Sequence, residues 1–124
     1  MRLRAVVFCV VALVANVANA ESADVAAGKS AFARCAACHS ISPGVTLVGP
    51  SLAGVAGRRV GSVAGFRYSN ALAASHDTWT PERLSAWLAD PAKVYPGNRM
   101  PFTVTDEKTR RELVAYLSTL SAAK

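Results

Sequence analysis

The sequence predicts a small all-α domain of about four helices joined by long loops. Apolar residues recur at spacings of three and four in several stretches, which is the pattern of helices with one buried face. Gly and Pro gather between these stretches, mainly from 43 to 65 and from 96 to 101. No stretch alternates apolar and polar residues for long enough to predict a strand. The 124 residues have room for one domain.

Residues 1–20 have the pattern of a signal peptide. Two arginines precede an apolar stretch at 5–17, and Ala-Asn-Ala follows at 18–20. The alternative is an uncleaved membrane anchor, but the apolar stretch has about 13 residues, whereas a membrane-spanning helix needs about 20. We therefore expect export, with cleavage after Ala20 and a mature domain of residues 21–124.

The helices are predicted in chain order from their start signals. Asp24 is placed to cap the first helix. Residues 39–69 then read as loop, and Ser69 can open a short helix that runs through Ala74. The last helix should begin near Thr105, where two acidic residues suit its positive end.

The third predicted helix has the clearest boundaries. Thr80 suits the N-cap, Pro81 suits the first helical position, and Pro91 should end the helix. The residues expected on the buried faces of the first, third and last helices are Val25, Gly28, Phe32, Cys35, Leu84, Trp87, Leu88, Leu113, Tyr116, Leu117 and Leu120.

The composition and one motif together predict a bound haem. A domain this small buries a modest share of its surface, and only 7% of the residues are aromatic, so a large apolar prosthetic group would complete the core. Cys35, Cys38 and His39 form C-x-x-C-H, the haem-attachment motif. Two cysteines at this spacing, at the end of a helix, can reach both vinyl groups of one porphyrin and form thioethers. The adjacent histidine then supplies an imidazole ligand to the iron.

The same motif has three other interpretations. A thioredoxin-like redox pair expects a βαβ context, which the sequence lacks. A zinc site needs further ligands, which only His76 or a carboxylate could supply. A disulfide is the default for cysteines of exported proteins, but a bridge across two residues would be strained. We therefore favour one covalently attached haem c.

Met100 is the candidate for the second axial ligand, because it is the only methionine besides the initiator. It lies in the proline-flanked loop 96–101, which could direct a side chain towards the iron. A methionine more often fills gaps in a core, and His76 would give bis-histidine ligation instead. His76 lies in a polar stretch typical of the surface, so we expect ligation by His39 and Met100.

The ordered series of motifs resembles the class I cytochromes c, near mitochondrial cytochrome c and bacterial cytochrome c2. The resemblance covers residues 24–120 and is more specific than C-x-x-C-H alone. The matching residues are Cys35, Cys38, His39, Gly49, Pro50, Leu52, Gly54, Gly57, Arg58, Gly65, Phe66, Tyr68, Trp79, Pro96, Gly97, Met100 and Phe102. The resemblance implies the cytochrome c fold, wrapped around one haem, and single-electron transfer rather than enzymatic catalysis.

The resemblance also implies roles for individual residues. The carbonyl of Pro50 would accept a hydrogen bond from His39 and orient its ring, and Gly28 would lie where the first helix crosses the last. The residues expected at the haem propionates are Arg58, Tyr68, Trp79 and, in place of a usual threonine, Asn98. Leu72 and Trp87 replace an asparagine and a tyrosine that are usual near the methionine ligand, so the reduction potential cannot be inferred from relatives.

The charge favours acidic partners. Without the two arginines of the leader, the 14 basic residues fall to 12, against 8 acidic ones, a formal net charge of +4. Such a surface suits salt-sensitive docking to redox proteins, and the resemblance places Arg34, Lys93 and Arg99 on the docking face. We expect a monomeric periplasmic carrier without nucleic-acid binding or stable membrane insertion. The alternatives are a subunit of a dehydrogenase complex, and a haem enzyme or gas sensor in which Met100 leaves the iron.

Overall fold

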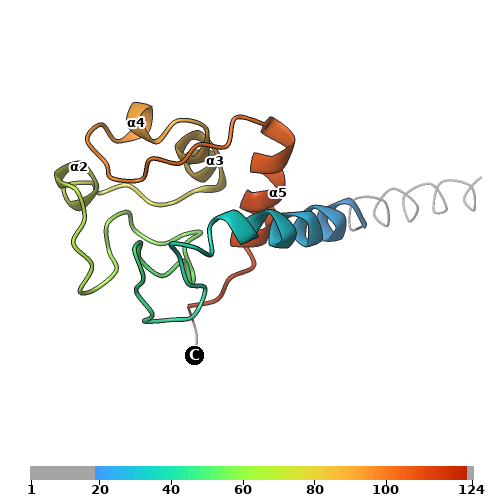
Figure 1. Ribbon diagram of the computed structural model, residues 1–124, viewed down its shortest axis with the longest axis horizontal. Coiled ribbons are helices and arrows are strands. Elements are labelled where there is room, and N and C mark those ends of the chain that lie inside the picture. Colours follow the sequence, from blue (N-terminus) through green and yellow to red (C-terminus); the bar gives the residue numbers. More distant parts are fainter. Residues whose placement is uncertain (1–18, 123–124) are drawn as a thin grey trace, which may run out of the picture.

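The computed structural model describes residues 19–122, and it is helical with long loops (Figure 1). The helices are residues 19–31, the 3-10 helix η1 (Phe32–Arg34), α2 (Asn70–Ala73), α3 (Pro81–Ala89), α4 (Pro91–Val94) and α5 (Glu107–Leu117). Within this range there is no strand, and an isolated antiparallel bridge joins Arg59 to Thr78. The predicted all-α class is therefore confirmed. None of the helices in residues 19–122 is long and apolar enough to span a membrane.

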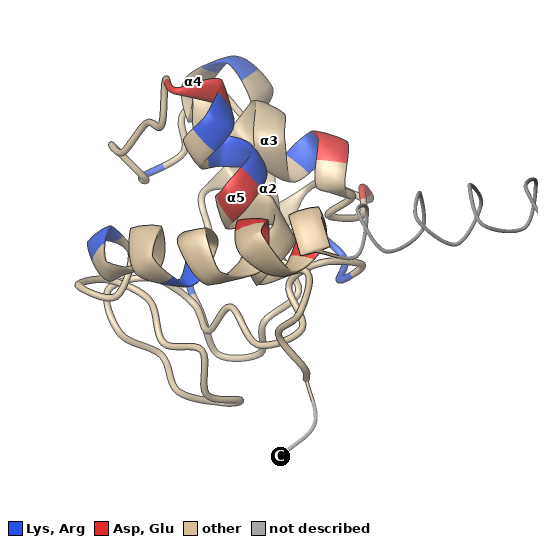
Figure 2. Cartoon of the chain, turned by 90° about the vertical axis from the view of Figure 1, so that its right-hand side faces the viewer, with Lys and Arg blue, Asp and Glu red and all other residues tan. Residues whose placement is uncertain are grey.

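The first helix runs across α5, as both views of the ribbon show (Figures 1 and 2). Gly28 is buried at the crossing, where a Cβ atom would lie 2.8 Å from the Cβ of Tyr116 and would overlap the carbonyl of Glu112. The missing side chain therefore allows the two backbones to approach. Phe32, one turn later, packs its ring against Tyr116 with centroids 5.5 Å apart. The predicted helix crossing is confirmed.

The core lies between this helix pair and α3. Its buried apolar residues come from all parts of the described chain: Phe32, Val55, Val60, Trp79, Leu84, Trp87, Leu88, Tyr95, Val104, Leu113, Tyr116 and Leu117. Complete burial of one such aliphatic side chain contributes about 1.5–3 kcal/mol. Leu120 was expected within the last helix, but it follows the end of α5 and packs on the core from there.

Hydrogen bonds confirm the helix starts predicted at Thr80 and Ser69, and they show that Asp106 caps the last helix, which begins near Thr105 as expected. The side chain of Thr80 accepts from the Arg83 N–H at 3.1 Å, and Asp106 accepts from the Thr109 N–H at 2.8 Å. Ser69 caps α2 in the same way. Each cap satisfies a backbone donor that the helix itself leaves free.

Two boundary predictions were wrong. Asp24 does not cap the first helix, because residues 19–31 are already helical; its carboxylate instead accepts from Arg111 Nε of α5 at 3.3 Å. Pro91 follows the end of α3 as expected, but it also occupies the first position of α4, which the side chain of Asp90 caps. The predicted signal peptide, apart from its last two residues, lies outside the described residues.

Candidate haem site

The two cysteines and the histidine of the motif lie on one turn that follows η1. The N–H groups of Cys38 and His39 both donate to the carbonyl of Cys35, at 3.0 and 2.8 Å. Both thiols are free; Cys35 is half-buried against the core and Cys38 is exposed. Burial raises the pKa of the Cys35 thiol, so it is held in the protonated form. No disulfide joins these two cysteines, so both sulfur atoms are free to form thioethers.

The ring of His39 is fixed by the next loop. Its Nδ1 lies 2.8 Å from the carbonyl oxygen of Pro50. Because a carbonyl only accepts, Nδ1 carries the proton and Nε2 is the nitrogen with a lone pair for a metal. Gly49 lies against the ring, and a Cβ atom there would be 2.7 Å from Nδ1. A glycine at 49 and a carbonyl at 50 therefore hold the imidazole in one orientation.

Arg58 is a half-buried cation whose bonding is incomplete. Its Nη1 donates to the carbonyls of Ser51 and Ala53, at 2.9 and 3.0 Å. Its Nε is buried and has no hydrogen-bond partner. Burial lowers the pKa of the guanidinium, because the charged form loses hydration. A buried donor without a partner costs about 1–3 kcal/mol, so this group is suited to an additional anionic acceptor such as a propionate.

Trp79 lies beside Arg58, whereas Tyr68 belongs to a different segment. The Trp79 N–H donates to the Arg58 carbonyl at 2.9 Å, and the Gly57 N–H donates to the Trp79 carbonyl at 2.8 Å. The hydroxyl of Tyr68 accepts from the Val63 N–H at 3.0 Å, which leaves its own proton for a further acceptor. The structure thus brings two of the expected propionate partners together and leaves a donor on the third.

Asn98 is bonded within its own loop. Its Nδ2 donates to the Tyr95 carbonyl at 2.9 Å, and its Oδ1 accepts from the Met100 N–H at 2.9 Å. Met100 is half-buried and packs against the core. His76, the competing ligand, is exposed, as its polar neighbours indicated. Asn98 therefore shapes the segment that presents Met100.

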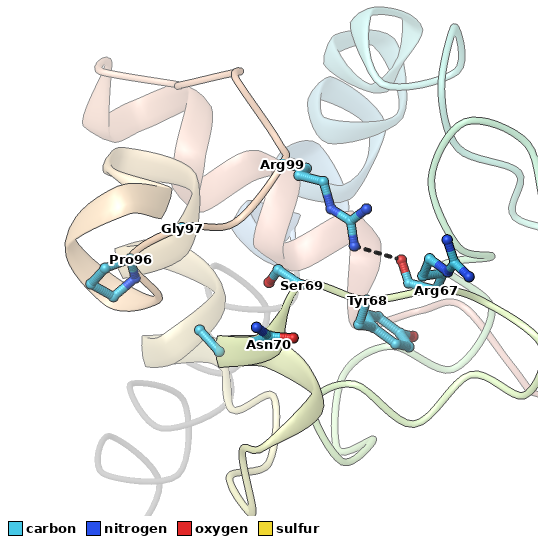
Figure 3. Close-up of a pocket in the computed structure, with 8 residues that line it drawn as sticks. Arg67, Tyr68, Ser69, Asn70, Pro96, Gly97 and Arg99 are labelled. Carbon is cyan, nitrogen blue, oxygen red and sulfur yellow. Dashed lines mark hydrogen bonds between the residues drawn. The ribbon is translucent and has the colours of Figure 1, made fainter.

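A groove of about 620 Å³ separates the loop of residues 95–101, here called the Met100 loop, from the segment around Tyr68 (Figure 3). It is lined by Arg67, Tyr68, Ser69, Asn70, Ala71, Pro96, Gly97 and Arg99. The guanidinium of Arg99 reaches across and donates to the Arg67 carbonyl at 3.0 Å (Figure 3). This bond ties the two segments together.

The charged side chains are unevenly distributed. Figure 2 shows blue and red gathered mainly on the helices, while the loops below the first helix are almost wholly tan. Residues 40–57 contain no charged side chain. Arg34, Lys93 and Arg99 are all exposed. In the sequence, Arg34 precedes the uncharged segment, whereas Lys93 and Arg99 precede Met100. Exposed aliphatic side chains in the segment include Ile41, Val45, Leu47 and Val48.

The residues do not form a zinc site. No group of three or more His, Cys, Asp or Glu side chains that could hold a metal ion is present in residues 19–122. His39 offers one nitrogen and Met100 a thioether, a donor set that suits haem iron. With two free thiols and an unpaired buried guanidinium nitrogen, the residues fit haem c.

Sequence reasoning missed Tyr95 and its polar neighbours. Tyr95 is 8% exposed, and its hydroxyl donates to Asp77 Oδ2 at 2.7 Å. Both residues lie between helices in the sequence, and neither belongs to an apolar repeat. The only sequence signal was the position of Tyr95 just before the Pro-Gly of the Met100 loop.

Comparison with known proteins decides the family. A family model described as cytochrome c matches residues 25–121. The chain belongs to the cytochrome c family. It is 41% identical to cytochrome c2 of Blastochloris viridis over 97% of this chain and 96% of that protein. The solved structure of cytochrome cH from Methylobacterium extorquens has a TM-score of 0.72 and 43% identity, covering 77% of this chain and 97% of its own. Ferricytochrome c2 from Rhodopseudomonas palustris has a TM-score of 0.71 and 33% identity, and the match covers 78% of this chain and 98% of that one.

These findings confirm the resemblance and the fold. This class I cytochrome c is an electron-transfer protein rather than an enzyme, and its family carries covalently bound haem c. Cys35 and Cys38 are the cysteines present in the matched residues for that attachment. Its partners are therefore other redox proteins.

Proposed function

We propose that this cytochrome c is a periplasmic single-electron carrier with one haem c, attached through Cys35 and Cys38 and ligated by His39 and Met100. The observation that carries the proposal is the hydrogen bond from His39 Nδ1 to the Pro50 carbonyl, on the same turn as two free thiols. It fixes the tautomer and the direction of Nε2. Haem iron with histidine and methionine ligands supplies one-electron chemistry at a raised potential.

Residues around the haem site would stabilise the negative charge of the haem propionates. Arg58 has one unpaired buried N–H, and Trp79 is held beside it by backbone pairing. We assign Arg58, Trp79 and the hydroxyl of Tyr68 to the propionates, where a guanidinium stabilises carboxylates. Asn98 was expected there as well, but both ends of its amide are used within the Met100 loop. Its first role is therefore to support Met100, and the second N–H of its Nδ2 is left for a propionate.

Leu72 and Trp87 are the positions at which the reduction potential would be tuned differently than in relatives. Trp87 is 9% exposed and packs edge-on against Trp79, with ring centroids 5.5 Å apart. Its indole offers a single N–H donor and no hydroxyl. Leu72 is half-buried on the core. The Met100 sulfur would then have less polar surroundings with less water, and the reduction potential would be specific to this chain.

Export is supported by the extent of the matches. The family match begins at residue 25, and two solved relatives are covered over 97% and 98% of their own lengths by 77% and 78% of this chain. The family match therefore lies after the leader-like residues 1–20. We propose cleavage after Ala20, a mature monomer of residues 21–124, and a periplasmic location.

The partner would dock over basic residues. Arg34, Lys93 and Arg99 are exposed, and we propose that they guide acidic redox proteins without stable insertion in a membrane. A dehydrogenase subunit is the second candidate within electron transfer; purification in fixed stoichiometry with a large catalytic chain would favour it.

Haem attachment is tested by mass spectrometry and the pyridine haemochrome spectrum of the mature protein. The expected result is one haem per chain with two thioethers, and impaired attachment in Cys38→Ser. Ala36→Ser, a substitution between the cysteines, should attach haem as the wild type does. Normal two-thioether haem in Cys38→Ser would contradict the assignment.

A further inference from the structure

The backbone of Met100 is held through a short relay of hydrogen bonds that begins at Tyr95. The Tyr95 carbonyl accepts from both the backbone N–H and the side-chain Nδ2 of Asn98, at 3.2 and 2.9 Å. Asn98 Oδ1 in turn accepts from the Met100 N–H at 2.9 Å. The position of Met100 therefore depends on where Tyr95 is fixed.

Tyr95 is fixed at its ring by two tryptophans. Its ring centroid lies 6.0 Å from that of Trp79 and 6.0 Å from that of Trp87. These contacts are edge-on or tilted, which is the favourable arrangement for aromatic pairs. They hold the ring in the core.

The phenol is fixed by a charged cluster that comes from two other segments. Tyr95 Oη donates to Asp77 Oδ2 at 2.7 Å, and Asp77 forms an ion pair with Arg83 of α3 at 3.2 Å. Arg83 Nη1 and the Ser75 hydroxyl lie 3.4 and 3.3 Å from the same phenol oxygen. One oxygen atom thus joins the Met100 loop to α3 and to the segment after α2.

The protonation states suit a strong bond. The hydrogen bond from Tyr95 holds the pKa of the Asp77 carboxyl below its usual value, and burial raises the pKa of the Tyr95 phenol. A neutral phenol therefore donates to an ionised carboxylate. Such charge-assisted bonds are short and stronger than those between neutral groups.

We propose that Tyr95, anchored by Asp77, is a positioning residue that keeps the Met100 loop closed. This inference rests on the proposed ligation by Met100 and adds the residue that controls how often the ligand leaves. The loop has two further ties, from Arg99 to Arg67 and from the Val104 N–H to the Leu88 carbonyl. Loss of the Tyr95 bond should therefore loosen the loop without unfolding the domain.

The test measures cyanide association with the ferric haem protein, since an exogenous ligand binds only while the methionine is away. Tyr95→Phe keeps the ring between the tryptophans and removes the bond to Asp77. The observed rate should rise about tenfold, the factor expected for one hydrogen bond to a charged acceptor. Asp77→Asn keeps a neutral acceptor and should raise the rate less. The double variant should match Tyr95→Phe, because both changes act on the same bond.

Tyr116→Phe is the matched control, because it also removes the hydroxyl of a buried tyrosine but lies in α5. It should leave the cyanide rate within twofold of the wild type. A purely structural role for Tyr95 predicts a loss of unfolding free energy with no change in the cyanide rate, and this result would overturn the inference. If Tyr95→Phe does not yield folded protein, Asp77→Asn carries the same test with the aromatic cluster intact.

The wild-type spectrum distinguishes a failure of the role of Tyr95 from a failure of ligation by Met100. If the methionine–iron charge-transfer band is present but the rates of all variants are equal, only the role of Tyr95 is refuted. If the wild-type ferric protein lacks the band, ligation by Met100 is refuted, and the inference falls with it.

Discussion

The crossing of the first helix over α5 allows a worked prediction for Gly28→Ala. The new methyl carbon would lie 2.7 Å from the carbonyl carbon of Glu112 and 2.8 Å from the Cβ of Tyr116. Carbon atoms in contact prefer about 3.5–4.0 Å, so one helix must move by about 1 Å. Overpacking of this kind costs about 1–3 kcal/mol, and because the clash is with the backbone carbonyl of Glu112, which cannot rotate away, we take the upper part of that range, about 2–3 kcal/mol. The higher helix propensity of alanine returns about 1 kcal/mol.

We therefore expect Gly28→Ala to lower the unfolding free energy by about 1–2 kcal/mol. The assay is urea unfolding of the ferric haem protein, followed by circular dichroism, with a change in midpoint at constant slope. Ser30→Ala, at an exposed position of the same helix, should stay within about 0.5 kcal/mol of the wild type. If Gly28→Ala equalled or exceeded the wild type in stability, the close approach of the two backbones would be wrong.

Three further predictions concern the imidazole, acid stability and docking. Gly49→Ala forces a methyl group against the His39 ring, so the purified ferric protein should show a weakened axial ligand field by electron paramagnetic resonance. The hydrogen bonds from Thr109 lower the pKa of the Asp106 carboxyl. Its contribution to stability is therefore present above the unfolded-state pKa of about 3.9 and is lost as the pH falls through the lower folded-state value. In acid unfolding curves, Asp106→Asn should lose less stability than the wild type over this pH range. Lys93→Gln should slow electron transfer to an acidic redox protein by about twofold or more at low salt, measured by stopped flow.

Each of these predictions has a control and a contrary result. Ala37→Gly, which adds no atom near the imidazole, should keep the wild-type resonance, and an unchanged Gly49→Ala signal would contradict the fixed ring. Identical acid unfolding curves for Asp106→Asn and the wild type would mean that Asp106 does not contribute to the pH dependence of stability. Lys29→Gln, on the first helix, should react as the wild type does; equal slowing by both lysine substitutions would mean that net charge matters rather than the proposed docking face.

Local signals were the part of the fold that the sequence predicted well. Ser69 and Thr80 cap their own helices through bonds three residues away, so a short window contains the whole interaction. Asp24 has the same residue type but a distant partner, Arg111, which no window could include. Pro91 fits either the end of one helix or the start of the next, and only the cap from Asp90 decides that both occur.

The candidate site divides in the same way. Cys35, Cys38 and His39 are adjacent in sequence, so their geometry follows from one turn. Asn98 was expected near a propionate from its position alone, but both ends of its amide already bond within its own loop, to Tyr95 and Met100. The bond between Tyr95 and Asp77 spans 18 residues and unites separate segments, so it required the fold.

The most direct test of the account is the ferric absorption spectrum of the wild type compared with Met100→Ala and His76→Ala. Ligation by Met100 predicts a methionine–iron charge-transfer band in the wild type and in His76→Ala, and its loss in Met100→Ala with covalent haem retained. A band that survives in Met100→Ala, or disappears in His76→Ala, would contradict the central claim that His39 and Met100 hold the iron.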